Sequence, residues 1–422
     1  MITVLIFLIA LIAYYTLGIR YQSVILTVLS LYVYWQVAEW NIIVIGFIAL
    51  FSITFCELLF KQKKKLYVIL SIFCIASSFL LLRERILGLG LPLGFSVLSF
   101  TSISLLVDQY RFPKRYGYFE VLSYLLFFPK IFAGPIERTS HFIKDTPIRF
   151  NGMEFYTGLK YLIFAAFVKF VMGDMFGKTE MSSFGLNQFA NVFVFAFGFF
   201  FDFWSYTLMA IGVGKLFGYT LSISFNRPYE SRTLQEFWHR WNITLGAWLR
   251  DYIYIPLGGN RNSTFKWVAI VMLVFLLSGL WHGSTLPFIV WGLCHGMILC
   301  VERKIIKPER FNCLGVAVYR IVVFILVAFL WQLFLIDSVK DIAPLIYSLF
   351  IYEALAPQIL YQFGVCLIGM FLLTSKKAVV ILNGQQSETN SIIAEVSVLS
   401  LMLLSLFLLN CQMSFNFFYF RF

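Results

Sequence analysis

WVAIVMLVFLLSGLWHGSTLPFIVWGLCHGMILCV, residues 267–301, is an apolar run without Asp, Glu, Lys or Arg. One crossing of a bilayer takes about 20 residues of α-helix. The run is therefore too long for a single crossing, and a break is predicted near Gly283–Pro287, where glycine and proline interrupt the pattern. Two membrane spans are expected here, and two histidines, His282 and His295, lie inside the apolar run.

The whole chain shares this apolar character. It has 422 residues, of which 60% are hydrophobic, whereas soluble globular domains have about 45–50%. Only helices and closed barrels satisfy every backbone N–H inside a bilayer. A barrel needs strands in which polar and apolar residues alternate, and stretches such as Val271–Leu277 do not alternate. The sequence therefore predicts an all-α polytopic membrane protein.

The apolar runs define candidate spans along the full length of the chain. They cover roughly residues 2–18, 22–38, 41–60, 66–82, 91–108, 118–135, 154–172, 189–217, 265–282, 284–301, 316–336, 358–374 and 391–409. Some of these runs can be re-entrant, so about eleven true crossings are expected. The first run is interpreted as a span, because no basic region precedes it as in a signal peptide. No linker or repeat divides the chain, so residues 1–422 are predicted to form one membrane domain.

The net charge of +12 comes from 33 Lys and Arg against 21 Asp and Glu. In so hydrophobic a chain this excess indicates basic cytoplasmic loops and attraction to anionic lipid, not nucleic acid. One basic cluster lies in residues 61–65 and another in residues 111–115. Two predicted spans separate them, so both clusters are expected on the cytoplasmic side, with the N-terminus outside.

Residues 226–262 break the membrane-span pattern because they carry many charged side chains. Within them, apolar residues recur at helical spacing: Leu234, Phe237, Trp238, Trp241, Leu245, Trp248, Leu249 and Tyr252. This stripe predicts an amphipathic helix over residues 234–253 that lies on or dips into the membrane. Pro256 and Gly258–Gly259 are expected to end it. An interfacial helix that carries no catalytic residue would give the same pattern.

The two histidines are candidates for chemistry, because an ionisable side chain at membrane depth is costly. A neutral imidazole can accept a proton from a hydroxyl, as acyl transfer requires. His282 is the first candidate and His295 the second; for each, the alternative is a buried histidine satisfied by a neighbouring helix. Asn242, on the stripe side of the predicted helix, can steady an oxyanion or orient the base. Four histidines and no dense carboxylate cluster favour no metal site.

Four stretches of the sequence resemble motifs of a known protein family. They are LFFPKIFAGPIER (126–138), FDFWSYTLMAIGVGKLFGY (201–219), SFNRPYESRTLQEFWHRWNITLGAWLRDYIYIPLGGNR (224–261) and LSGLWHG (277–283). Together they resemble the membrane-bound O-acyltransferase (MBOAT) family, over about residues 90–300. The PLGGNR ending is similar to the bacterial branch of the alginate O-acetyltransferase type.

The resemblance implies a ring of tilted helices around a tunnel through the membrane, lined by the WHG histidine, His282, as the essential residue. The resemblance also matches Asn242 to the second site residue of the family. Bacterial polysaccharide members usually carry His at this position, whereas sterol and diacylglycerol acyltransferases carry Asn. His239 lies three residues earlier, one helical turn away, and can substitute in part for that His. His295 matches a recurrent position of the bacterial branch.

The RDY element of the family matches Arg250 and Asp251. The resemblance alone admits an auxiliary role for this pair in the reaction. A structural salt bridge between opposite charges is the preferred interpretation.

The resemblance also implies a reaction across a bacterial cytoplasmic membrane. A cytoplasmic acyl thioester, in the simplest case acetyl-CoA, meets an acceptor hydroxyl from outside, and no tightly bound cofactor is expected. The first-choice acceptor is an exported cell-envelope polysaccharide, reached through an extracytoplasmic acyltransferase- or esterase-like partner protein. D-Alanyl transfer to teichoic acid is the second choice and acetylation of peptidoglycan the third.

Two interpretations outside the enzyme class remain open. In a transporter or channel the same histidines relay protons, and intramembrane acids are expected; Asp174 and Asp202 are the obvious acids within late spans. In a non-catalytic scaffold the chain only recruits an extracytoplasmic transferase.

Overall fold

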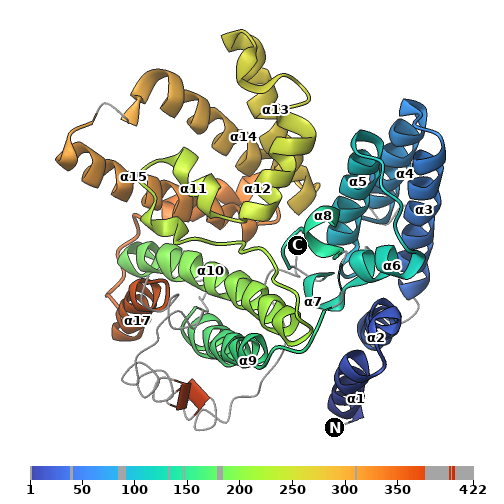
Figure 1. The fold of residues 1–422 in the computed structure, drawn as a ribbon. Helices are drawn as coiled ribbons and strands as arrows, with labels where there is room; N and C mark the ends of the chain where they lie inside the picture. Colours follow the sequence, from blue (N-terminus) through green and yellow to red (C-terminus); the bar gives the residue numbers. More distant parts are fainter. Residues whose placement is uncertain are drawn as a thin grey trace. The chain divides into compact units, whose positions relative to one another are not determined.

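The computed structural model describes residues 2–38, 41–83, 92–131, 134–144, 146, 148–177, 184–308, 311–375, 399–400 and 402–403. Every regular element within these residues is a helix (Figure 1). The predicted all-α class is therefore confirmed. The chain divides into two compact units, Met1–Leu162 with Thr207–Ile223, and Ile163–Tyr206 with Ser224–Phe422. The prediction of one membrane domain stays a prediction.

The first unit begins with eight helices. They are α1 (Ile2–Thr16), α2 (Ile19–Ala38), α3 (Ile42–Lys61), α4 (Lys65–Arg83), α5 (Phe95–Arg111), α6 (Tyr118–Leu126), α7 (Phe128–Ile131) and α8 (Thr139–Phe142). Figure 1 shows α3, α4 and α5 side by side, and each packs against the others. The unit boundary falls within α9 (Gly152–Phe167) and within α10 (Gly185–Leu216), so each of these helices contributes one end to either unit.

The second unit contains the segments that the sequence singled out, with η marking 3₁₀ or π helices. Its elements are η2 (Val168–Phe176), η3 (Pro228–Glu230), α11 (Leu234–Arg240), α12 (Ile243–Leu249), η4 (Arg250–Tyr254), η5 (Gly259–Arg261), α13 (Thr264–His282), α14 (Leu286–Val301), η6 (Glu302–Ile306), α15 (Cys313–Trp331), η8 (Gln332–Phe334), η9 (Val339–Asp341), α16 (Ile342–Ser348) and α17 (Pro357–Leu373). The helices α13 and α14 form a hairpin, visible in Figure 1.

The membrane character follows from these helices. Within the described residues, α3, α4, α10, α13 and the α15–η8 segment are long and apolar enough to cross a bilayer. Leu5–Thr16 and Pro357–Leu373 are shorter apolar helices. The chain is therefore a multi-pass membrane protein, while the expected number of about eleven crossings stays a prediction. Most of the predicted run 391–409 lies outside the described residues.

One predicted span, 118–135, is wrong as a continuous helix. Helix α6 ends at Leu126, and Phe127 takes a non-helical backbone (φ −52°, ψ 102°) before the short α7. Pro129 has no N–H to continue the helical ladder. The backbone N–H of Phe128 instead donates to the Ser30 hydroxyl of α2 at 3.2 Å, so the break is satisfied by a neighbouring helix.

The two basic clusters of the first unit meet at the helix ends. The Lys63 ammonium donates to the Arg111 carbonyl at 3.5 Å and lies 5.8 Å from the centre of the Tyr110 ring. Residues 61–65 and 111–115 therefore occur at the same end of this unit, as the sequence predicted. This agrees with a common side of the membrane for both clusters.

The predicted amphipathic helix over 234–253 is wrong in one respect, because it breaks after Arg240. Trp241 is extended and Asn242 is left-handed (φ 42°, ψ 55°). At the break, the Asn226 N–H donates to the Arg240 carbonyl and the Ile243 N–H donates to the Ser224 carbonyl. These bonds to the preceding non-helical segment compensate for the lost helical bonds.

Other features of that prediction are confirmed. Five of the eight residues of the apolar stripe are buried, with 1% exposure for Phe237 and 4% for Trp241, while Trp238, Leu249 and Tyr252 are partly buried. The helical segment ends at Tyr254, before the predicted Pro256, and Gly258 has a positive φ of 101°. Within the first helical part, Arg240 also lies 2.5 Å from Glu236.

Candidate active site

The WHG segment is a helix end followed by a tight return. His282 is the last residue of α13, and the Gly283 N–H donates to the Gly279 carbonyl at 3.1 Å. Gly283 is extended, and a Cβ atom there would overlap the Phe288 ring. Helix α14 begins at Leu286 with Pro287 in its first turn. The missing N–H of proline costs no hydrogen bond there, because the first N–H groups of a helix have no partner within it. The predicted break near Gly283–Pro287 is confirmed.

Three glycines bring the arms of the hairpin together. A Cβ on Gly279 would touch the Phe288 carbonyl, and a Cβ on Gly292 would touch the Phe275 carbonyl. A Cβ on Gly296 would lie 3.1 Å from the Met272 sulfur. Small residues allow helix backbones to approach closely in membrane proteins. The two histidines are thereby held on one closely packed pair of helices.

His282 is half-buried within aromatic rings of the second unit. Its ring centre lies 4.5 Å from that of Trp281, 5.1 Å from Trp291 and 4.9 Å from Phe334. The Trp291 and Phe334 rings meet the imidazole edge-on. The imidazole is only partly exposed, and the rings lower the polarity around it. This combination suits a general base.

His295 lies one aromatic ring away from His282 and is fully buried. Trp291 separates the two imidazoles, with ring centres 5.1 Å from His282 and 5.0 Å from His295. Trp238 of α11 meets His295 edge-on at 4.9 Å. Neither ring nitrogen of His295 has a hydrogen-bond partner within the described protein. Within the described residues, the interpretation of His295 as a histidine satisfied by a neighbouring helix is therefore wrong for hydrogen bonding.

Asn242 and His239 lie on either side of the break in the predicted helix. His239 is an exposed residue in the last turn of α11. Asn242 precedes α12, and its side chain makes no capping hydrogen bond. They are therefore not one turn apart on a single helix, and that expected relationship is wrong. The left-handed backbone at Asn242 suits asparagine better than most residues.

Arg250 and Asp251 form an ion pair with each other, as predicted. The Arg250 Nε atom lies 2.9 Å from Asp251 Oδ1, and the Arg250 side chain is 62% exposed. Exposed pairs of this kind contribute about 0–1 kcal/mol to stability. The ion pair is confirmed, while its structural role and an auxiliary role in the reaction both stay predictions.

A buried carboxylate, Glu302, joins these elements and was missed by the sequence analysis. It is 3% exposed and accepts hydrogen bonds from the Leu234 N–H (2.6 Å), the Gln235 N–H (2.9 Å) and the Tyr319 hydroxyl (3.0 Å). It thus connects the start of α11 to the end of α14 and to α15. In the sequence Glu302 only looks like the polar flank of an apolar run, beside Arg303.

Comparison with known families agrees with this arrangement. Residues 2–340 match the sequence profile of MBOAT, the membrane-bound O-acyltransferase family. This chain belongs to the MBOAT family. The match includes the α13–α14 hairpin with His282 and His295, as well as Asn242. The suspected family resemblance is confirmed.

Among curated MBOAT-like relatives, a probable alginate O-acetylase (AlgI) of Pseudomonas aeruginosa is 34% identical over 262 residues, covering 59% of this chain and 50% of the relative. A peptidoglycan O-acetyltransferase of Helicobacter pylori is also 34% identical, over 53% of this chain and 50% of the relative. A teichoic acid D-alanyltransferase of Streptococcus thermophilus is 30% identical, over 52% and 58%. The aligned part spans about half the length of these relatives.

Proposed function

We propose that this MBOAT protein is an O-acyltransferase that moves an acyl group, in the simplest case acetyl, from a cytoplasmic thioester to a hydroxyl of an exported cell-envelope polysaccharide. The observation that carries the proposal is His282, a half-buried imidazole at the end of α13 within an apolar, aromatic setting. The family match over residues 2–340, and relatives named for O-acetylation of alginate and peptidoglycan, support the same reaction class.

The proposed reaction uses His282 as a general base. Its unprotonated ring nitrogen accepts the proton of the acceptor hydroxyl while the hydroxyl oxygen forms a bond to the thioester carbonyl carbon. The resulting oxyanion collapses, the carbon–sulfur bond breaks, and the leaving thiolate takes the proton from the imidazolium. The products are an O-acyl ester and a free thiol, and the imidazole returns to its starting state.

Asn242 is proposed as the second site residue. Its amide N–H₂ can donate to the developing oxyanion or hold the base in orientation. The left-handed backbone at Asn242 places this amide at a turn between α11 and α12 instead of inside a helix. His239 on the preceding helix is the competing candidate, and its exposed position favours Asn242.

The surroundings of the reaction are part of the proposal. A ring of about eleven tilted crossings encloses a tunnel, in which an acyl donor such as acetyl-CoA meets an acceptor from the other side of a bacterial cytoplasmic membrane. No tightly bound cofactor is needed, since the thioester supplies the activated carbonyl. An extracytoplasmic acyltransferase- or esterase-like partner protein completes the transfer to the polysaccharide.

A second candidate is D-alanyl transfer to teichoic acid. The 30% identity to the streptococcal D-alanyltransferase favours it. The same base and oxyanion chemistry applies to a D-alanyl group that is carried as a thioester. The higher identity to the two O-acetylating relatives places acetyl transfer first.

The test compares the native chain with His282→Ala and His282→Gln in membranes of the producing cell. We expect both variants to accumulate normally and to abolish ester-linked acetate, released by mild base from the cell-envelope polymer. Base-released D-alanine is measured in the same samples. Loss of D-alanine with unchanged acetate would favour D-alanyl transfer to teichoic acid. Undiminished release of both groups by His282→Ala would exclude His282 as the base.

A further inference from the structure

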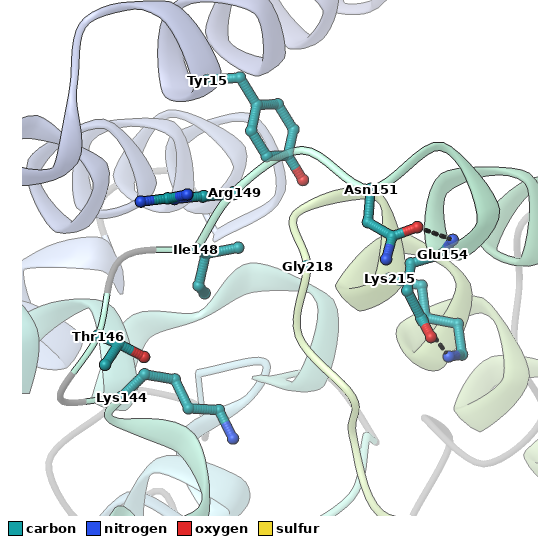
Figure 2. A pocket seen from close by; sticks show the side chains of 9 residues that line it. All are labelled: Tyr15, Lys144, Thr146, Ile148, Arg149, Asn151, Glu154, Lys215 and Gly218. Atoms are coloured by element: carbon teal, nitrogen blue, oxygen red, sulfur yellow. Dashed lines mark hydrogen bonds and ion pairs between the residues drawn. The ribbon is translucent and has the colours of Figure 1, made fainter.

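A cavity of about 290 Å³ lies in the first unit, and none of the site residues described above lines it (Figure 2). Lys144, Arg149 and Asn151 line it from the segment that leads into α9. Lys215 lines it from the last turn of α10, and Tyr15 from α1. We propose that this cavity binds a phosphate-bearing ligand.

The charge of the cavity wall is the first argument. Lys215 is 8% exposed and its ammonium lies 2.5 Å from the Glu154 carboxylate, so these two charges neutralise each other. Lys144 and Arg149 are exposed, and neither has an ion-pair partner among the described residues. The cavity therefore keeps two positive charges that a ligand can neutralise.

The cavity wall is held in place by hydrogen bonds, which is the second argument. Gln22 of α2 bonds both backbone groups of Ile148: its amide donates to the carbonyl at 2.7 Å and its Oε1 accepts from the N–H at 3.3 Å. The Tyr15 hydroxyl donates to the Leu216 carbonyl at 2.8 Å. A wall fixed in this way loses little conformational freedom when a ligand binds.

Polar groups at the α9 end complete the wall. The Asn151 Oδ1 atom accepts N–H bonds from Met153 at 2.9 Å and from Glu154 at 3.2 Å, so the start of α9 is already capped. Figure 2 shows the Lys215–Glu154 pair and Asn151 along one side of the cavity, with Lys144 and Arg149 on the other. Lys144 and Arg149, which have no ion-pair partner among the described residues, are thus the groups left for an anion.

The chemistry of these cations favours phosphate over carboxylate. Two positive charges match the charge of about −1.5 to −2 that a phosphate monoester carries at neutral pH. The planar fork of an arginine binds phosphate oxygens in pairs, and lysine adds a mobile point charge. A carboxylate neutralises only one of the two. The phosphate can belong to the diphosphate of a nucleotide-type thioester donor or to the headgroup of an anionic lipid.

The experiment measures binding of inorganic pyrophosphate to the full chain in a zwitterionic detergent, by calorimetry. The double variant Lys144→Gln with Arg149→Gln is compared with Lys65→Gln with Arg115→Gln, which removes one lysine and one arginine outside the cavity. We expect the cavity variant to weaken binding about tenfold or more, as for the loss of two charged hydrogen bonds screened by water, and the control variant to stay near the native affinity. Thermal melting checks that both variants fold.

The two sources of phosphate are separated by competition. Displacement of pyrophosphate by coenzyme A, but not by dihexanoyl phosphatidylglycerol, assigns the site to a soluble donor; the reverse assigns it to lipid. Absent pyrophosphate binding, equal loss in both double variants, or equal binding of acetate would overturn the proposal. The site does not depend on acyl transfer, so loss of acetylation in the His282 variants with intact pyrophosphate binding leaves it standing.

Discussion

The Glu302 Oε2 atom accepts the backbone N–H of Leu234 at 2.6 Å, across a separation of 68 residues. The carboxylate thus occupies the start of α11, where unpaired N–H groups and the helix dipole favour a negative charge. Because Glu302 follows α14 directly, this bond fixes α11 to the hairpin that carries both histidines. Together with the packing of Trp238 on His295, it links the segment before Asn242 to the hairpin that carries His282.

We expect Glu302→Gln to lower both stability and acyl transfer. The amide keeps one acceptor oxygen but loses the charge, and its N–H₂ faces two backbone donors. The loss should be about 1.5–3 kcal/mol, the value for hydrogen bonds to a charged group. Thermal melting and ester-linked acetate are measured together. Tyr319→Phe removes only the third bond to Glu302, so we expect it to have the smaller effect of the two. A larger effect from Tyr319→Phe than from Glu302→Gln would contradict the prediction.

The Gly283→Ala variant tests the packing beside His282. Its Cβ atom overlaps the Phe288 ring, and overpacking of this kind costs about 1–3 kcal/mol. We expect reduced acyl transfer, because relief of the overlap moves the ring that packs on His282. Gly364→Ala is the matched control, since a Cβ there meets nothing within 4 Å. Equal activity of the two variants would show that acyl transfer does not depend on a small residue at position 283.

The His295→Phe variant separates stability from function. The imidazole is buried with both nitrogens unpaired in the described protein, and an unsatisfied buried polar group costs about 1–3 kcal/mol. Phenylalanine fits the surrounding Trp238 and Trp291 rings without that cost. We therefore expect an unchanged or higher melting temperature, with acyl transfer reduced about tenfold or more if a nitrogen serves the reaction. Full activity with a raised melting temperature would assign His295 to packing alone.

The sequence predicted those features that local residue chemistry determines. The break at Gly283–Pro287 and the helical end before Pro256 follow from glycine and proline, and the structure confirms both. The buried stripe through Phe237 and Trp241 follows from helical spacing and is also confirmed. These features need no knowledge of distant parts of the chain.

Two features were not predicted from the sequence, because each depends on hydrogen bonds to residues far away in the chain. The break at Asn242 is stabilised by backbone bonds to Ser224 and Asn226, and no propensity of residues 234–253 encodes those bonds. Glu302 gave no signal, because an acid next to an apolar run looks like an ordinary span boundary. Both features are visible only once distant backbone groups are placed.

A buried ion cluster in the second unit gives the last prediction. The Lys169 ammonium is fully buried, 2.6 Å from Asp202 and 3.0 Å from Asp174. These are the two acids on which the transporter interpretation depended, and both pair with the same lysine. Breaking a buried pair by removing one partner costs about 3–5 kcal/mol, so Lys169→Met should strongly reduce the amount of folded protein.

The second variant combines Lys169→Met with Asp202→Leu. Of the three charges only the Asp174 carboxylate then remains, and its side chain is 21% exposed, so the buried uncompensated charge of Asp202 is gone. We therefore expect the double variant to regain part of the melting temperature that Lys169→Met loses. Glu57→Gln, which breaks the exposed pair with Lys61, should cost no more than about 1 kcal/mol. If proton-coupled transport required the acids, the double variant would be stable but would lose a transport activity that the native chain shows in vesicles. Retained acetylation in that variant would place the ion cluster outside the reaction.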